Sequence, residues 1–323
     1  MPPLQSLQRD FPSIDANFLQ FCASHRIFSV EDFLVHDLQR LVAFAECQDM
    51  SKDLKKGIAE VLSIIDSQHQ PLSNGMELLG DTRREKILFS TGCEGIDLLL
   101  QGGLRGGQLT ELVGPSPSGK TQVCLQAASH IAHKYMGTVM FLDTSNSFSP
   151  KRVAYLVSRL LSPSVKEVKE RTIKRVMSNI FCYSVFDIFM LLDVLHQLEF
   201  KLRSQVQIKN EDTNLHLLVV DSFSSLITAV LGGKGSHGHS LMVSAGFLLK
   251  KLADEHNLAV LVTNHMVGGE GGISKPALGE SWKTVPHVRL LLSHDHGSNF
   301  CNISILKHTC MVRYLHNLSW LWI

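Results

Sequence analysis

One glycine-rich run limits what this chain can fold into more than any other feature of its sequence: Gly114, Pro115, Ser116, Pro117, Ser118, Gly119, Lys120 and Thr121. An apolar run precedes it and an amphipathic run follows it. This context predicts a strand, a tight loop and a helix, in which backbone N–H groups and the helix N-terminus surround phosphate groups. In such a loop Lys120 reaches the β- and γ-phosphates of a nucleotide, and the Thr121 hydroxyl ligates magnesium. The run therefore predicts ATP and Mg²⁺ as cofactors.

From Ser90 onward, short apolar runs alternate with long amphipathic ones. This alternation predicts an α/β fold, a mostly parallel sheet with helices on both faces, whose ligands bind at the carboxyl ends of the strands. The predicted strands are Leu109–Val113, Val139–Asp143, Ile180–Tyr183, Leu215–Asp221, Ala259–Thr263 and Val288–Leu292. The predicted helices are Gln122–Tyr135, Lys151–Leu161, Val185–Leu202 and Leu241–Glu255, and the charged run Lys166–Arg175 is interpreted as a solvated helix face.

Polar residues end two of these strands. An apolar strand that ends in an aspartate is the usual magnesium-side partner of a phosphate loop, so Asp221 is a predicted Mg²⁺ ligand beside Thr121. Asn264 and His265 end a second strand, where they could sense the γ-phosphate or orient water; the alternative is that they only begin a loop. The 16 histidines show no metal-ligand spacing.

The N-terminal part has the pattern of a small helical bundle, with Ser29 as a predicted helix N-cap. A helix-hairpin-helix DNA module is one interpretation, and a packing or protein-contact domain is the other, because the turn His25–Phe28 has no glycine. The predicted domains are a helical N-terminal domain (1–67), a linker (68–89), an ATPase core (90–309) and a separate tail (310–323).

Composition excludes several classes of protein. The formal net charge is +1, so contact with nucleic acid needs a local patch rather than a basic chain. The seven cysteines form no C-x-x-C pair, which argues against a zinc site and a disulfide framework. The sequence shows neither a signal peptide nor an apolar run long enough for a membrane span, so we expect a soluble intracellular protein without a membrane partner.

Several runs resemble the RecA-type recombinase family from about Ser90 to His308. The family match rests on the segments Thr91–Gly103, Gly106–Glu111 and Lys275–Gly279, and on Arg289. Within the family the chain is most similar to the eukaryotic strand-exchange recombinase paralogues of the D type, in the plant form. That closer match rests on Ser24–Ile27, Thr121–Leu125 and Phe186–Phe189. The resemblance implies a RecA-like P-loop NTPase core behind a small all-α domain.

The chain departs from the strand-exchange members at three places. Ser145 stands where the family's water-activating glutamate belongs, and losing a general base typically costs ~10²–10⁴ in rate. The linker lacks the family's Phe-x-x-Ala assembly motif. The match stops after Thr309, and the apolar tail 310–323 suggests a variant C-terminus that adds no native strand and leaves a sheet edge uncovered.

Three functions remain open at this point. The first, which the resemblance implies, is a nuclear ATP-binding mediator of homologous-recombination repair of double-strand breaks. It would bind single-stranded DNA weakly within a complex of recombinase paralogues, with at most a weak DNA-dependent ATPase activity. Two glycine-rich segments, Leu231–His239 and Val267–Lys275, are candidates for contact with DNA, although both contain few cations. The second is a scaffold that ATP merely cements, and the third a P-loop small-molecule kinase, for which no arginine-rich lid is evident.

Overall fold

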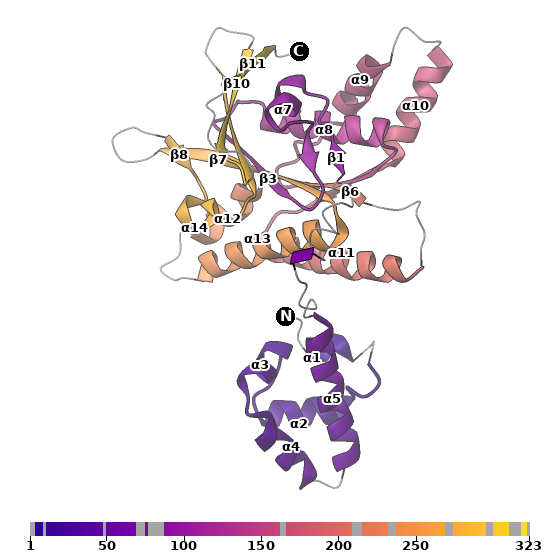
Figure 1. Ribbon diagram of the computed structural model, residues 1–323, viewed down its shortest axis with the longest axis vertical. Helices are drawn as coiled ribbons and strands as arrows, with labels where there is room; N and C mark the ends of the chain where they lie inside the picture. Colours follow the sequence, from indigo (N-terminus) through magenta and orange to yellow (C-terminus); the bar gives the residue numbers. More distant parts are fainter. Residues whose placement is uncertain are drawn as a thin grey trace. The chain divides into compact units, whose positions relative to one another are not determined.

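The computed structural model describes residues 4–8, 11–47, 50–68, 75–76, 87–161, 166–208, 215–231, 237–268, 274–294, 300–309 and 318–321. The chain divides into two compact units, residues 1–81 and 82–323 (Figure 1). Most of the predicted linker, and the glycine-rich stretches 232–236 and 269–273, lie outside the described residues. Within the described part, no helix is both long and apolar enough to cross a membrane.

The first unit is a helical bundle, as its sequence pattern predicts. Phe18 and Phe33 stack at its centre, with ring centroids 6.2 Å apart. Gly57 is needed there, because a Cβ atom at that position would lie 2.4 Å from the Phe18 ring. The helices are α1 (Leu4–Leu7), α2 (Ala16–Ser24), α3 (Val30–Val35), α4 (Leu38–Glu46) and α5 (Ser51–Gln68).

Two helices of this unit, α3 and α4, each begin at a side chain that caps the first turn. Ser29 caps α3, and Asp32 completes the capping box by accepting from the Ser29 backbone N–H. The helical pattern that follows does not give one helix: Asp37 accepts from the first N–H groups of α4 and so starts a new one. The turn before α3 has no glycine, and Arg26 itself takes the left-handed conformation, with φ of 60°.

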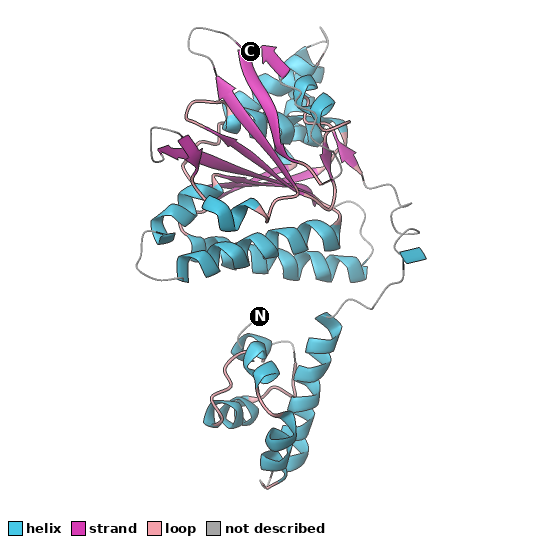
Figure 2. Ribbon diagram, turned by 60° about the vertical axis from the view of Figure 1, so that its left-hand side comes forward, coloured by secondary structure: helices cyan, strands magenta, loops and turns pink. Residues whose placement is uncertain are grey.

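The second unit is built on one large sheet with the strand order β11-β10-β9-β3-β7-β6-β4-β5, with β8 pairing to β7 (Figure 2). The strands from β9 to β5 in this order are parallel, whereas β10, β11 and β8 join antiparallel. The bounds are β3 (Leu109–Gly114), β4 (Thr138–Asp143), β5 (Ile180–Ser184), β6 (Leu215–Asp221), β7 (Ala259–Gly268), β8 (Ser274–Pro276), β9 (Val288–His294), β10 (Phe300–Lys307) and β11 (Leu318–Leu321). Two short strands, β1 (Leu88–Phe89) and β2 (Leu104–Arg105), form a separate pair.

Helices cover both faces of this sheet, which confirms the predicted α/β class with a mostly parallel sheet. One buried cluster packs α7, α8, α9 and α10 on one face, and a second packs α11 to α14 on the other. Trp282 lies fully buried in the second cluster, stacked on Phe223. The helices are α7 (Glu94–Leu99), α8 (Lys120–Lys134), α9 (Pro150–Leu160), α10 (Lys166–Ser178), α11 (Ile188–Ile208), α12 (Phe223–Leu231), α13 (His237–His256) and α14 (Gly279–Lys283).

The tail corrects one expectation from the sequence. We expected 310–323 to add no strand, but Leu318–Leu321 forms β11 and pairs antiparallel with β10, from Ile303↔Leu318 to Phe300↔Leu321. The physical reason is that the outer edge of β10 carries backbone N–H and C=O groups that a further strand satisfies. The remainder of the tail lies outside the described residues.

Candidate nucleotide-binding site

The predicted phosphate loop connects β3 to α8. Gly119 takes a φ of 88° directly before Lys120 begins the helix, a conformation that glycine adopts without strain. Gly114 has no room for a side chain either, since a Cβ atom there would lie 2.4 Å from both the Leu292 carbonyl oxygen and Ser118 Oγ. Both glycines of the motif are therefore required by the shape of the loop.

The Lys120 amine lies inside this loop and is buried. Its Nζ donates to the Gly114 carbonyl at 2.7 Å, the Pro115 carbonyl at 2.9 Å and Ser118 Oγ at 3.4 Å. Burial lowers the pKa of Lys120, and the Asp221 carboxylate opposes that shift. The lysine is thus held in the loop, within electrostatic reach of the aspartate.

Asp221 ends β6 with half of its carboxylate unused. Oδ1 accepts from Thr263 Oγ1 at 2.6 Å, whereas Oδ2 is buried and has no hydrogen-bond partner among the described residues. A buried carboxylate oxygen without a partner is costly unless a cation or water fills the place beside it. The orphaned oxygen and the Thr121 hydroxyl are the oxygen donors that Mg²⁺ prefers, so the residues present fit a magnesium nucleotide.

His265 lies beside the loop because β7 pairs with β3 in the register Gly114↔His265. Its ring Nε2 is 2.9 Å from Ser222 Oγ, and its backbone N–H donates to Ser224 Oγ at 3.0 Å. Burial lowers the pKa of His265, and Lys120 lowers it further. Burial and Lys120 thus favour the neutral form of the ring, and Asp221 opposes them.

Asn264, the other predicted residue of this strand end, contacts the buried carboxylate of Glu111. Its Nδ2 donates to Glu111 Oε1 at 2.7 Å, and its Oδ1 is buried without a partner in the described part of the chain.

Ser145 lies on an exposed loop that Asp143 shapes. Asp143 Oδ1 accepts from the backbone N–H groups of Ser145 and Ser147, both at 3.1 Å, and Oδ2 accepts from the Phe148 N–H at 2.9 Å. Among the described residues, no side chain accepts a hydrogen bond from the Ser145 hydroxyl, so none is placed to turn this hydroxyl into a base. The loop thus offers a formed backbone but no carboxylate for activating water.

Sequence reasoning missed the group that ties this site to the rest of the unit. Glu111 on β3 is fully buried and accepts from Asn264, from Trp282 Nε1 at 2.9 Å and from Arg289 Nε. The available signal was a carboxylate inside the otherwise apolar run of β3, which has to be paired when it is buried.

A set of hydroxyl groups at the strand ends was also missed. Thr144 Oγ1 accepts from the Ser222 N–H at 2.7 Å and lies 2.7 Å from Ser225 Oγ. These contacts join the end of β4 to the end of β6, where Asp143 and Asp221 are opposite each other. The signal was the Ser or Thr that follows each strand-ending aspartate.

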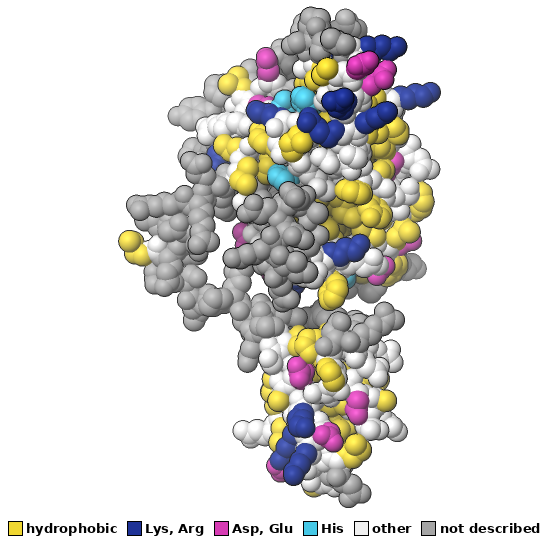
Figure 3. Space-filling view, turned by 90° about the vertical axis from the view of Figure 1, so that its right-hand side faces the viewer, with side chains coloured by type: hydrophobic (Ala, Val, Ile, Leu, Met, Phe, Trp, Pro, Cys, Tyr) yellow, Lys and Arg dark blue, Asp and Glu magenta, His cyan; other side chains and the backbone are white. Residues whose placement is uncertain are grey.

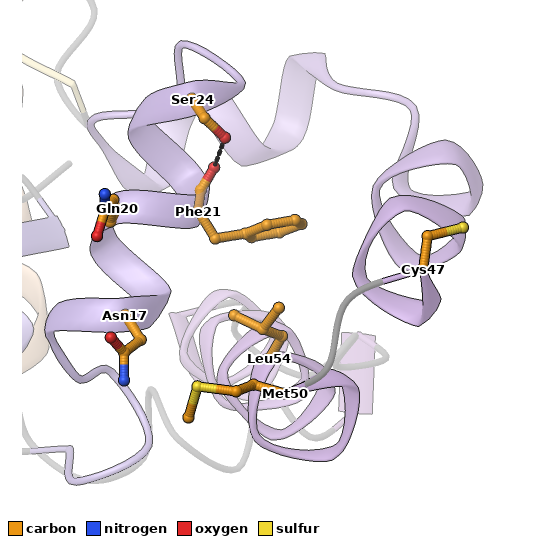
Figure 4. Close-up of a pocket in the computed structure, with 7 residues that line it drawn as sticks. All are labelled: Asn17, Gln20, Phe21, Ser24, Cys47, Met50 and Leu54. Atoms are coloured by element: carbon orange, nitrogen blue, oxygen red, sulfur yellow. Dashed lines mark hydrogen bonds between the residues drawn. The ribbon is translucent and has the colours of Figure 1, made fainter.

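The first unit contains a separate cavity of about 600 Å³. Figure 4 shows Phe21, Met50 and Leu54 around it, with Ser24 Oγ donating to the Phe21 carbonyl at 2.7 Å. None of the described residues that line it is charged. The described residues that line it are Asn17, Gln20, Phe21, Ser24, Cys47, Met50 and Leu54.

The amino-acid sequence is similar to those of several known proteins. A sequence model described as Rad51 matches residues 82–305. The chain is 33% identical over 289 residues to "DNA repair protein RAD51 homolog 4" of Bos taurus, a match that covers 89% of this chain and 84% of that one. It is 27% identical over 322 residues to "Probable DNA repair protein RAD51 homolog 4" of Dictyostelium discoideum, covering 87% and 90%. It is also 27% identical to "Meiotic recombination protein DMC1 homolog A" of Oryza sativa subsp. japonica, covering 75% and 71%.

Proposed function

The chain belongs to the Rad51 family, and we propose that it is a nuclear, ATP-binding mediator of homologous-recombination repair that acts in a complex of Rad51 paralogues. The observation that carries the proposal is the complete phosphate loop facing the half-free carboxylate of Asp221 in a family-matched core. The names of the relatives point to DNA repair and meiotic recombination. Because relatives named RAD51 homolog 4 cover most of the chain, we assign it to the D-type branch.

The nucleotide would be held by residues 114–121, with Mg²⁺ on Thr121 and Asp221. Magnesium supplies neutralisation of phosphate charge. Lys120 would stabilise the phosphates with its positive charge, once its amine leaves the loop carbonyls and donates to the phosphate oxygens instead. His265 can donate or accept a hydrogen bond at the same edge of the sheet. With Ser145 in place of a carboxylate, we propose at most a weak DNA-stimulated ATPase activity.

Lys120→Ala tests the nucleotide site. A charge-assisted bond to phosphate is worth ~1.5–3 kcal/mol, so the affinity for a fluorescent ATP analogue with Mg²⁺ should fall roughly ten- to a hundredfold. Lys134→Ala, at the far end of the same helix, is the matched control and should bind as the unaltered chain does. An unchanged affinity in the Lys120 variant would remove the role given to this residue.

The free edge of β5 supports assembly with another chain. β5 is an end strand of the sheet, and Phe181 and Tyr183 on it are 50% and 43% exposed. Phe186 and Phe189 just beyond it are each 60% exposed. Figure 3 shows hydrophobic side chains exposed over one side of the second unit. No described strand pairs with the outer edge of β5, and such an edge beside exposed aromatic rings is a surface to which an extended segment of a partner can add as a strand.

Co-purification from the chain's own cells tests this assembly. The tagged chain should retain other Rad51 paralogues, and Tyr183→Asp with Phe186→Asp should release them. Phe200→Asp with Phe247→Asp is the matched control, because both rings are similarly exposed on α11 and α13. Recovery of no paralogue, or equal retention by the two double variants, would contradict the proposal.

A scaffold cemented by ATP is the second candidate, and the absence of a carboxylate at Ser145 favours it. Single-stranded DNA binding separates the two. The assembled complex of a mediator should bind a labelled single strand, weakly and more tightly with ATP, and a scaffold should not.

A further inference from the structure

The C-terminal ends of α8 and α10 bring together exposed cations that the nucleotide site does not use. α8 packs against α10, and Arg175 on α10 acts electrostatically on His133 near the end of α8. Figure 3 shows Lys and Arg side chains gathered toward the top of the second unit, with histidine and a group of Asp and Glu side chains beside them. We call the exposed cations at these two helix ends the basic cluster: Lys134, Arg171, Lys174 and Arg175.

Among the described residues, the basic cluster has no carboxylate within ion-pair distance, unlike the other charged surface of this unit. On α11 and α13, Arg203 and Lys251 each lie 3.0 Å from Glu199. On α10, five cations face two carboxylates, Glu167 and Glu170, which gives a net charge of +3. Neither carboxylate comes within ion-pair distance of a cation in the described part of the chain, and both lie in the N-terminal half of the helix. The C-terminal half is left with positive charge only.

The neighbouring histidines report the same excess of positive charge. Burial lowers the pKa of His133, and Arg175 lowers it further. Burial likewise lowers the pKa of His130, and Lys134 adds to the effect while Asp97 opposes it. Cations crowded together on two helix ends, without anions of their own, are complementary to an external polyanion.

The spacing and composition of α10 indicate which polyanion. Arg171, Lys174 and Arg175 stand three and four positions apart, so they form a row with neighbours about 5–6 Å apart. α10 carries no aromatic residue. Tyr135, next to Lys134 at the end of α8, is packed against Phe89 and accepts from the Ser90 N–H, so its ring is not an open stacking platform. Surfaces that bind single strands add exposed aromatic rings for stacking on bases. We propose that the basic cluster binds the phosphate backbone of duplex DNA, without reading its sequence.

This surface is separate from the nucleotide site. α8 begins at the phosphate loop and has 15 residues, so its far end lies about 22 Å away along the helix axis. Binding at the cluster is therefore independent of ATP and goes beyond the proposed function. Its failure and that of the proposed function are distinguishable, because Lys120→Ala should leave duplex affinity unchanged.

The test measures anisotropy of a labelled duplex of about 20 base pairs, titrated with the full chain between about 50 and 200 mM salt. The cluster variant is Lys174→Gln with Arg175→Gln. The control is Lys52→Gln with Lys201→Gln, which removes the same charge from exposed sites on α5 and α11. In the cluster variant the duplex affinity should fall about five- to tenfold at low salt. The slope of log affinity against log salt should shrink by about 2, because each lost phosphate contact removes about 0.9.

The other outcomes overturn the proposal. Equal losses in the two double variants would mean that only overall charge matters. If the cluster variant has an unchanged affinity for the duplex but a lower melting temperature, these cations only stabilise the C-terminal ends of the helices through the helix dipole. Displacement of the duplex by poly-glutamate at equal charge concentration would mean that the cluster binds acidic protein surfaces instead.

Discussion

Glu111 joins four elements through one carboxylate. It lies on β3, three residues before the phosphate loop, and accepts hydrogen bonds from β7, α14 and β9. A fully buried carboxylate is tolerated only because an arginine and two neutral donors satisfy it.

Glu111→Gln should therefore destabilise the second unit strongly. The change leaves the Arg289 guanidinium buried without its anion, which costs about 3–5 kcal/mol in comparable pairs. Urea denaturation measures the free energy of unfolding. Glu280→Gln is the control, since its pair with Lys283 is exposed and worth at most about 1 kcal/mol. Equal midpoints for the two variants would show that the Glu111 network carries no stability.

Ser145→Glu should raise the rate of ATP hydrolysis. We expect the unaltered chain to turn over below about 0.1 per second, under the range of ordinary enzymes. The substitution restores a carboxylate at an exposed position, while Asp143 continues to hold the loop through backbone N–H groups. Phosphate release measures the rate. Ser145→Gln matches the new side chain in size without its charge and should stay slow. A rate of several per second in the unaltered chain, dependent on Lys120, would refute this account.

The local motif made Lys120, Thr121 and the glycines predictable, because the residues that define a phosphate loop are consecutive. Glu111 could not be found in this way. Its partner Asn264 is 153 residues away in sequence, and Arg289 is 178 residues away. A sequence pattern shows that a carboxylate in an apolar strand needs a partner, but only the fold shows which one. The roles of Asn264 and His265 toward phosphate stay predictions.

At the scale of elements, α11 and α13 are joined by an ion network centred on Glu199. His196, Lys251 and Arg203 lower the pKa of Glu199 to about 2 against the opposing effect of burial, and its side chain is 14% exposed. Arg203 also reaches Glu255 on α13 at 3.3 Å.

This network predicts a pH dependence of stability. A carboxyl group whose pKa is lower in the folded state stabilises the fold above its unfolded pKa, here 4.5, and loses that contribution as the pH falls toward 2. Because Arg203 and Lys251 are partly exposed, solvent screens these ion pairs, and the network stabilises the fold by about 1–2 kcal/mol. Glu199→Gln should remove this part of the acid destabilisation in melts between pH 5 and about 3. Glu170→Gln should not, and identical profiles for the two would exclude the network as the cause.

The tail gives a second prediction at this scale. Ending the chain after Thr309 removes β11 and uncovers the backbone of β10. Lost ladder hydrogen bonds at about 0.5–1.5 kcal/mol each should lower the melting temperature by several degrees, and the bare edge should promote aggregation. Melts and light scattering of the two chains side by side check both effects. A truncated chain that melts unchanged and stays more soluble would restore the original expectation that the tail adds nothing.

Elements with a strong period were predictable, and elements that depend on distant partners were not. All six predicted strands form. Five of them are largely buried, and buried parallel strands are continuous apolar runs, whereas β5 at the end of the sheet is exposed along most of its length. Their ends shifted: β7 runs on to Gly268, where β8 pairs with it. β10 was missed because its role comes from pairing with β9. The break between α3 and α4 was missed because Asp37 competes locally with the helical pattern.

For the whole molecule, we expect association with other chains rather than with copies of itself. We propose that the outer edge of β5 accepts a strand of a partner, and the linker 68–89 lacks the Phe-x-x-Ala assembly motif of the strand-exchange members. Light scattering with ATP, Mg²⁺ and DNA should therefore detect no long homopolymers. Adding a paralogue recovered by co-purification should give a particle of fixed size. Steady growth of scattering with the purified chain alone would disprove this expectation.

The position of β3 at the centre of the sheet has a consequence for synthesis on the ribosome. Its two neighbours, β7 and β9, begin at Ala259 and Val288, so β3 waits for about 150 more residues before either can pair with it. At roughly 5–20 residues per second, this wait lasts on the order of ten seconds. The helices of the first unit, whose contacts are local, can fold meanwhile. A nascent chain therefore exposes the apolar β3 strand until at least Ala259 has been made, and a chain that stops before Val288 lacks β9, one of the two strands that pair with β3.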